Sequence, residues 1–92
     1  MKIRDDQKPL RKDEFITDSM EGEMILHHPG SDRFLYLNQT AAIVWEQCGG
    51  TLTVGEIITG LEEAFPAFAS QIRGDVESTL TAFYQNRCIS LK

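Results

Sequence analysis

The sequence predicts a single α+β domain in which short strands come first and helices follow. Two observations support this prediction. Residues 12–37 hold short apolar and aromatic runs interrupted by turn signals such as Pro29-Gly30, a pattern typical of strands. After Leu37 the spacing of apolar residues changes to that of amphipathic helices. A chain of 92 residues, 41% of them hydrophobic, is long enough for one small globular core.

Three strands are expected, at residues 14–17, 23–27 and 33–37. Gly22 precedes the second strand and Pro29-Gly30 ends it. The third strand is aromatic and aliphatic after its first residue, and such residues favour strands. These segments predict either a three-stranded meander or a hairpin with one further edge strand.

Two helices with clear start signals follow the strands. Asn38 is a favourable N-cap for the first helix, which Gly49-Gly50 ends. Thr53 and Glu56 have the spacing of a capping box, in which each side chain accepts a hydrogen bond from the other residue's backbone N–H. We therefore expect the second helix to begin at Thr53.

The second helix is expected to end at Pro66, and a third helix follows it. The apolar residues of this third helix recur at helical spacing, at Ile72, Val76, Leu80 and Phe83. We expect the helices to pack on the sheet, with Trp45 buried where they meet.

The organisation of the chain predicts one domain behind a short arm. Residues 1–11 are polar and contain Pro9, so we expect a flexible arm before a domain at residues 12–92. The start has no apolar segment of a secretory signal, and no apolar run is long enough to span a bilayer. Cys48 and Cys88 are too few for a disulfide scaffold. These features predict a cytoplasmic protein with reduced thiols and no membrane partner.

The charge distribution argues against binding to nucleic acids. The net charge is −5, and five of the nine basic residues fall within the first twelve positions, so the remaining chain is strongly acidic. Affinity for nucleic acids depends largely on Lys and Arg side chains that displace counterions from phosphates. The sequence therefore predicts no nucleic-acid partner.

No constellation of side chains predicts catalysis or metal binding. His27 and His28 are adjacent, so in a strand they point to opposite faces, and no CxxC or HxxxH spacing accompanies them. Cys48 has no neighbouring base in the sequence, and Gly49-Gly50 lacks the rest of a phosphate-loop pattern. We expect a binding protein that is not an enzyme and holds no metal or cofactor.

A strand at residues 33–37 is suited to binding a peptide if it lies at an edge of the sheet. An exposed edge is a template on which a peptide can add as a further strand. Because side chains alternate along a strand, Phe34 and Tyr36 share one face while Leu35 and Leu37 share the other. Two aromatic side chains left at the surface favour peptide binding.

The run Leu-Asn-Gln-Thr-Ala-Ala-Ile-Val-Trp at residues 37–45 resembles the PqqD-like family. Further positions that fit the family pattern are Gly50, Thr53, Glu56-Ile57, Leu61, Phe65, Asp75-Val76, Leu80, Phe83 and Ile89. The similarity covers residues 10–91. One departure is Arg87-Cys88-Ile89, where relatives commonly have a glycine before the final apolar pair.

The resemblance implies a winged helix-turn-helix with an N-terminal three-stranded antiparallel sheet followed by three helices, the RiPP recognition element. Members bind the leader of a ribosomally made precursor peptide and present it to a modifying enzyme. In the member that gives the family its name, this enzyme is of the radical-SAM type and acts on the route to pyrroloquinoline quinone (PQQ). The leader adds beside the third strand and lies against the third helix. Carried onto this chain, the resemblance implies a peptide-binding site made of Arg33, Phe34, Leu35, Tyr36, Leu37, Arg73, Val76, Leu80 and Phe83.

Two other functions fit the same fold. Winged helices also occur in DNA-binding regulators, but the helix expected at residues 53–65 carries Glu56, Glu62 and Glu63 and no basic residue. A structural subunit that forms a homodimer through its exposed strand would use the same edge as a peptide.

Overall fold

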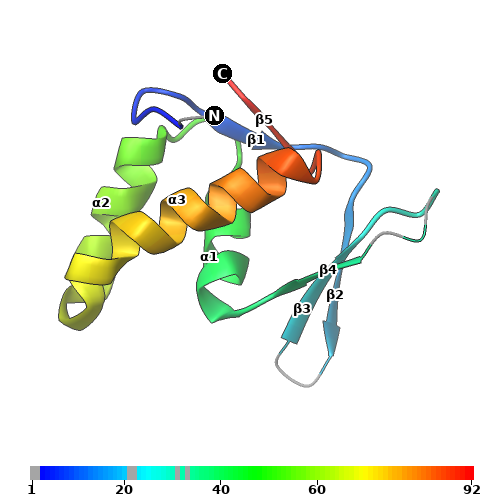
Figure 1. Ribbon diagram of the computed structural model, residues 1–92, viewed down its shortest axis with the longest axis horizontal. Helices are drawn as coiled ribbons and strands as arrows, with labels where there is room; N and C mark the ends of the chain where they lie inside the picture. The colour runs from blue at the N-terminus through cyan, green and yellow to red at the C-terminus, as the bar shows by residue number, and fades with distance from the viewer. Residues whose placement is uncertain (1–2, 21–22, 31, 33) are drawn as a thin grey trace.

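The computed structural model describes residues 3–20, 23–30, 32 and 34–92. Its elements follow in the order β1 (Pro9–Arg11), β2 (Ile16–Met20), β3 (Glu23–His27), β4 (Phe34–Leu37), α1 (Gln39–Gln47), α2 (Val54–Ala64), the 3-10 turn η1 (Pro66–Phe68), α3 (Ala69–Gln85) and β5 (Ile89–Leu91). The predicted α+β fold, with a three-stranded antiparallel sheet before three helices, is confirmed (Figure 1). Within the described residues, no helix is both long and apolar enough to cross a membrane.

The three-stranded sheet has the order β2-β3-β4, so β3 is its central strand. Leu26 of β3 lies opposite Leu35 of β4, and Leu26 is fully buried, which identifies the face of the sheet that packs on the core. The first of these strands begins at Ile16, later than the sequence predicts. A turn occupies the preceding residues, closed by a hydrogen bond from the Phe15 N–H to the Lys12 carbonyl (3.3 Å).

The first two helices begin at the caps that the sequence indicates. The Asn38 side chain accepts a hydrogen bond from the Ala41 N–H at 2.8 Å. Thr53 Oγ1 accepts from the Glu56 N–H at 3.1 Å, and the Glu56 carboxylate accepts from the Thr53 N–H at 2.9 Å, which completes the capping box. Between the two helices, Gly50 adopts a left-handed φ of 85° that glycine tolerates without strain.

The core lies between the sheet and the three helices. Trp45 of α1 is buried, and its ring meets the ring of Phe83 of α3 edge to face. The other fully buried aliphatic side chains come from both sheets and all three helices: Leu26, Val44, Val54, Ile57, Ile58, Val76, Leu80 and Ile89. The predicted burial of Trp45 where the helices meet is confirmed.

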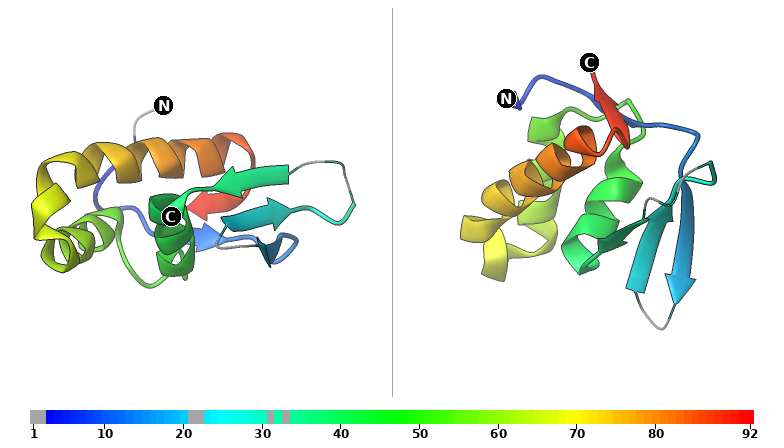
Figure 2. Two further views of the ribbon diagram at one scale, coloured as in Figure 1. Left: turned by 90° about the horizontal axis from the view of Figure 1, so that it is seen from below. Right: turned by 45° about the vertical axis from the view of Figure 1, so that its right-hand side comes forward.

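Residues 3–11 are packed on the domain, which corrects the prediction that they belong to a flexible arm. β1 pairs antiparallel with β5, so segments near the two ends of the chain lie side by side (Figure 2), and Ile3 is buried. The Val54 and Gly55 N–H groups begin α2 and have no partner inside that helix. They donate to backbone carbonyls of residues 3–11 at 2.8 and 3.0 Å. The segment is therefore held in place by hydrogen bonds to the start of α2 and by pairing with β5.

Candidate functional site

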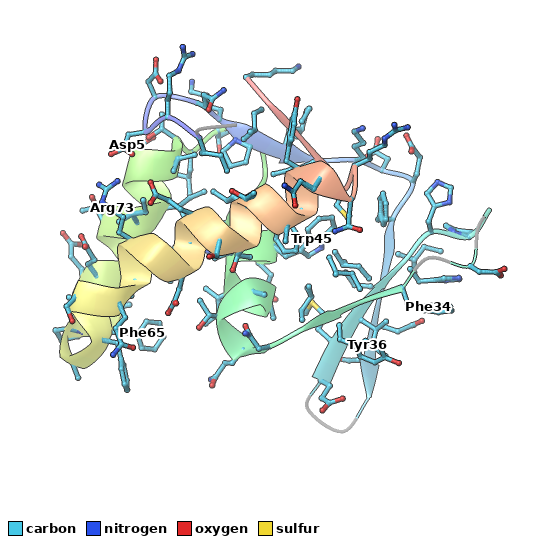
Figure 3. All side chains as sticks on the ribbon, viewed as in Figure 1. Asp5, Phe34, Tyr36, Trp45, Phe65 and Arg73 are labelled. Atoms are coloured by element: carbon cyan, nitrogen blue, oxygen red, sulfur yellow. The ribbon has the colours of Figure 1, made fainter. Side chains whose placement is uncertain are left out.

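β4 forms an edge of the three-stranded sheet, and among the described residues no strand pairs with its outer side. Its side chains alternate as the sequence predicts. Leu37 is buried and Leu35 is half-buried, whereas Phe34 is 58% exposed and Tyr36 is 71% exposed. Figure 3 shows both aromatic residues along this strand. Arg33, which the resemblance places in the site, lies outside the described residues.

The exposed face of β4 continues onto β3. His27 lies opposite Phe34, and their rings stack with centroids 4.8 Å apart and planes 11° from parallel. Ile25, which is half-buried, lies opposite Tyr36. Phe34 is therefore supported from one side by a stacked ring, and this support fixes its orientation at the surface.

The stripe of α3 that the resemblance places against a peptide belongs to the core. Val76, Leu80 and Phe83 are each at most 1% exposed, so none of them presents a surface to a ligand. They are buried because the other helices pack around this stripe, with Phe83 against Trp45. The structure therefore corrects their assignment from peptide contacts to core residues.

Arg73 is engaged with the N-terminal segment. Its guanidinium donates hydrogen bonds to both carboxylate oxygens of Asp5, at 2.9 and 3.0 Å, and lies 3.8 Å from the Glu77 carboxylate. The hydrogen bonds to Asp5 raise the pKa of Arg73 and lower the pKa of the Asp5 carboxyl. Figure 3 shows this pair far from Phe34 and Tyr36. Arg73 thus pairs with Asp5 in the absence of a peptide, and its contact with a bound peptide stays a prediction.

The opposite flank of α3 faces the side of the molecule on which α1 begins. Asp75, Thr79 and Ala82 stand at positions i, i+4 and i+7, which share one side of a helix. Asp75 is exposed, Thr79 and Ala82 are half-buried, and Asp75 lines a cavity together with Thr40 of α1. Thr79 stands beside the apolar stripe in the sequence, and the acidic charge of Asp75 favours a basic residue of a bound peptide at this flank.

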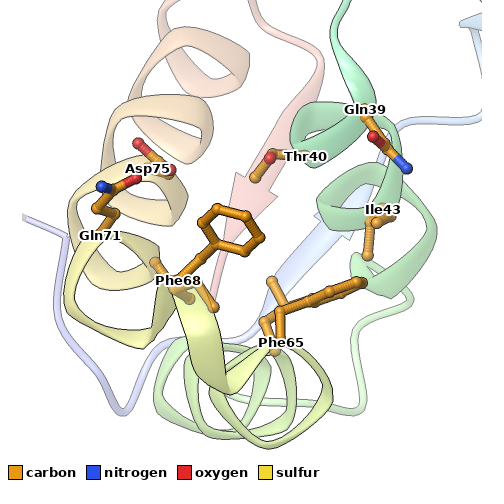
Figure 4. Close-up of a pocket in the computed structure, with 9 residues that line it drawn as sticks. Gln39, Thr40, Ile43, Phe65, Phe68, Gln71 and Asp75 are labelled. Atoms are coloured by element: carbon orange, nitrogen blue, oxygen red, sulfur yellow. The ribbon is translucent and has the colours of Figure 1, made fainter.

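A cavity of about 450 Å³ lies where the start of α1, the end of α2, η1 and the start of α3 meet (Figure 4). It is lined by Gln39, Thr40, Ile43, Leu61, Phe65, Phe68, Gln71, Ile72 and Asp75. Phe65 is 40% exposed and Phe68 is 58% exposed. In Figure 4 the Phe68 ring projects into the space between α3 and α1. The sequence signal for this cavity was the pair of phenylalanines around Pro66, although this pair does not by itself predict a cavity.

The described residues include no group of three His, Cys, Asp or Glu side chains that could hold a metal ion. His27 stacks on Phe34, whereas the ring of neighbouring His28 meets that of Phe15 with centroids 5.2 Å apart. Burial raises the pKa of the Cys48 thiol to about 12. That thiol is therefore protonated at neutral pH and is a poor nucleophile.

A family model of coenzyme PQQ synthesis protein D (PqqD) matches residues 23–89. The chain belongs to the PqqD family. The matched segment runs from β3 to the beginning of β5, and it includes the β4 edge, the Asp75 flank of α3 and the cavity. Searches of curated proteins and of solved structures gave no match. The PqqD family is named for PQQ synthesis, and membership associates this chain with that process.

Proposed function

We propose that this protein binds the leader of a ribosomally made precursor peptide by adding it as a strand to β4, and presents the peptide to a modifying enzyme of the radical-SAM type. The observation that carries the proposal is the unpaired outer edge of β4 beside the exposed rings of Phe34 and Tyr36. An edge strand supplies backbone donors and acceptors, and these give affinity and register to an added strand. Membership of the PqqD family supports the same function.

The expected orientation of the peptide is antiparallel to β4. Every strand pair in the β2–β4 sheet is antiparallel, and antiparallel pairing is slightly more stable per residue than parallel pairing. The peptide then lies between β4 and the flank of α3 that carries Thr79 and Ala82. Both side chains are small, so they leave room for the larger side chains of a peptide strand.

Titration of the ¹⁵N-labelled protein with a peptide tests this proposal. The probes are synthetic peptides encoded by the short reading frames beside the gene, with a scrambled version of each as control. We expect amide shifts at residues 34–37 and at residues 75–82, where the peptide would lie. Shifts confined to residues 54–64 of α2, or no shift with any of these peptides, would contradict the proposal.

Methylation of the peptide backbone tests strand addition itself. Along an added strand, only every second N–H faces the strand with which it pairs. Single N-methyl groups placed in turn along the peptide should therefore weaken binding at alternate positions. A uniform effect along the peptide would indicate side-chain recognition without a shared sheet, and it would overturn this part of the proposal.

Self-association through β4 is a second candidate, because the same unpaired edge favours it. Two copies would pair their β4 strands and cover Phe34 and Tyr36. Sedimentation across a range of protein concentrations distinguishes the two functions, since a homodimer that uses this edge should dissociate when a peptide binds. DNA binding has no comparable support, because α2 carries Glu56, Glu62 and Glu63 and no basic residue.

A further inference from the structure

The cavity between the helices begins where β4 ends. Leu37 is the last residue of β4, and Gln39 and Thr40 line the cavity. A strand advances about 3.3 Å per residue. A peptide added to β4 therefore reaches the mouth of the cavity about two to four residues beyond the position opposite Leu37.

The direction of the peptide decides which of its parts reaches the cavity. β4 runs from Phe34 to Leu37. A strand antiparallel to it runs from the position opposite Leu37 toward the position opposite Phe34. The residues beyond Leu37 then belong to the N-terminal side of the paired segment, while its C-terminal side leaves the domain past Phe34.

The walls of the cavity are suited to a large apolar side chain. Ile43, Leu61 and Ile72 form its aliphatic lining, and the rings of Phe65 and Phe68 remain partly exposed beside them. The volume of about 450 Å³ falls within the range of about 300–1,000 Å³ for ligand pockets. Exposed apolar surface of this kind, bordered by polar residues, is typical of interaction sites.

The polar rim of the cavity favours a basic neighbour for that apolar side chain. Asp75 is the one charged residue among the described residues that line the cavity, and none of them is Lys or Arg. Asp75 is exposed, so its charge contributes more to orientation and to the choice of partner than to affinity.

We propose that this cavity is a second subsite for the peptide bound at β4. It takes one large apolar side chain, located about two to four residues N-terminal to the peptide residue opposite Leu37, and a neighbouring Lys or Arg faces Asp75. This inference rests on the proposed function. Recognition then has two parts. The β4 edge binds the backbone of a peptide of any sequence, and the cavity selects the register in which the peptide pairs with β4.

A coupling experiment between protein and peptide tests the inference, with the same synthetic peptides as probes. Phe68→Ala removes a cavity wall, and Phe34→Ala is its matched control because both side chains are 58% exposed. We expect Phe68→Ala to lower the affinity for the full-length peptide about tenfold. Phe68→Ala should leave unchanged the affinity for a peptide shortened to the segment that pairs with β4. Phe34→Ala should weaken the binding of both peptides.

The outcomes separate the two proposals. If Phe68→Ala weakens the binding of the full-length and the shortened peptide equally, or changes the binding of neither, the cavity is not a subsite. Strand addition to β4 then still stands, because the peptides bind. If no peptide binds the parent protein, the proposed function fails and the subsite fails with it. If Phe68→Ala impairs only association with the modifying enzyme, the cavity belongs to that enzyme and the inference is overturned.

A charge exchange tests the role of Asp75. Asp75→Lys should weaken the binding of a peptide that carries Lys or Arg beside its apolar anchor. Replacement of that basic residue of the peptide by Glu should restore binding to the variant. Equal effects of Asp75→Lys on both peptides would overturn the proposed contact. Thermal melting of each variant without peptide verifies that the fold is intact.

Discussion

Arg73 binds Asp5 through two parallel hydrogen bonds, at 2.9 and 3.0 Å, and so joins α3 to a residue 68 positions earlier in the chain. The backbone carbonyl of Asp5 also accepts the Gly55 N–H at 3.0 Å. One residue of the N-terminal segment thus connects the start of α2 with the outer side of α3. The two segments lie close together here, since a Cβ added at position 55 would be in van der Waals contact with the Asp5 carbonyl oxygen, at 3.4 Å.

Asp5→Asn should make stability less dependent on acid pH. The hydrogen bonds from Arg73 lower the pKa of Asp5 in the folded protein, so the ionised carboxyl stabilises the fold. This stabilisation is complete above the ordinary Asp pKa of about 4 and is lost as the pH falls through the lower folded-state pKa. Urea unfolding between pH 7 and pH 2 measures it. Asp13→Asn, at an exposed position, is the control, and an equal pH dependence for both variants would contradict the prediction.

Thr53→Ala should destabilise the protein by about 1 kcal/mol, because α2 loses its N-cap. The hydrogen bonds with Thr53 also lower the pKa of Glu56. The larger cause is the hydrogen bond from the Thr53 backbone N–H, which the substitution keeps, so removal of the hydroxyl should raise that pKa only in part. A ¹³C titration of the carboxyl group detects the change. Thr51→Ala changes an exposed threonine near the same loop and should leave both measurements unchanged. An unchanged free energy of unfolding in Thr53→Ala would argue against the role of Thr53 as the N-cap.

Trp45→Ala should lower stability by about 3–5 kcal/mol, since it leaves a cavity at the centre of the core. The Trp45 and Phe83 rings lie 5.3 Å apart between centroids, with planes at 74°, and this contact is lost together with the buried area. Chemical unfolding measures the change. Tyr84→Ala, at a side chain that is 41% exposed, should shift stability by less than about 0.5 kcal/mol. Similar losses for the two variants would contradict the placement of Trp45 in the core.

Tyr36→Ser and Leu37→Ser should have opposite consequences, although they change adjacent residues of β4. Tyr36 is exposed, so its loss should weaken peptide binding with little change in melting temperature. Leu37 is buried, so its loss should lower the melting temperature, and a truncation of this kind costs about 2–5 kcal/mol. Calorimetric melting and a peptide titration on the same samples separate the two effects. A destabilised Tyr36→Ser would place that ring in the core.

Arg87→Gly should stabilise the protein by roughly 0.5–1 kcal/mol. Arg87 has a φ of 60°, a left-handed conformation that strains a residue with a side chain, and the PqqD-like pattern has a glycine before the final apolar pair. Part of the gain is offset because glycine is more flexible in the unfolded chain. Gln85→Gly, in the last turn of α3, should instead destabilise. If both variants were less stable than the parent, the turn at Arg87 would not be strained.

The sequence alone was sufficient to predict the elements whose signals lie within a few residues of one another. Asn38 and the Thr53–Glu56 pair marked where α1 and α2 begin, because capping uses residues within one turn of each other. The alternation of Phe34 and Tyr36 with the two leucines of β4 predicted which side chains share a face of the sheet. The apolar stripe of α3 was also found, but periodicity alone could not tell whether Leu80 contacts the core or a ligand.

Features that depend on distant residues were not predictable. Residues 9–11 have no alternation of their own, and they form a strand only because residues 89–91 pair with them. The pairing of Arg73 with Asp5 was not predictable for a similar reason, since Asp5 is remote in the sequence. The cavity near Phe68 takes its walls from four elements, so the phenylalanines around Pro66 alone could not show that a cavity forms there.

The pairing of Pro9 in β1 with Leu91 in β5 has a consequence for synthesis of the chain on the ribosome. β1 leaves the ribosome before β2–β4 and the three helices, whereas its partner strand β5 follows them, so β1 must wait for it. The β2–β4 sheet joins strands that are neighbours in the sequence, and it closes over short loops at low entropic cost. We therefore expect β4 and α1 to take shape on the nascent chain before the N-terminal strand docks. The edge to which a peptide would add then exists before the domain is complete.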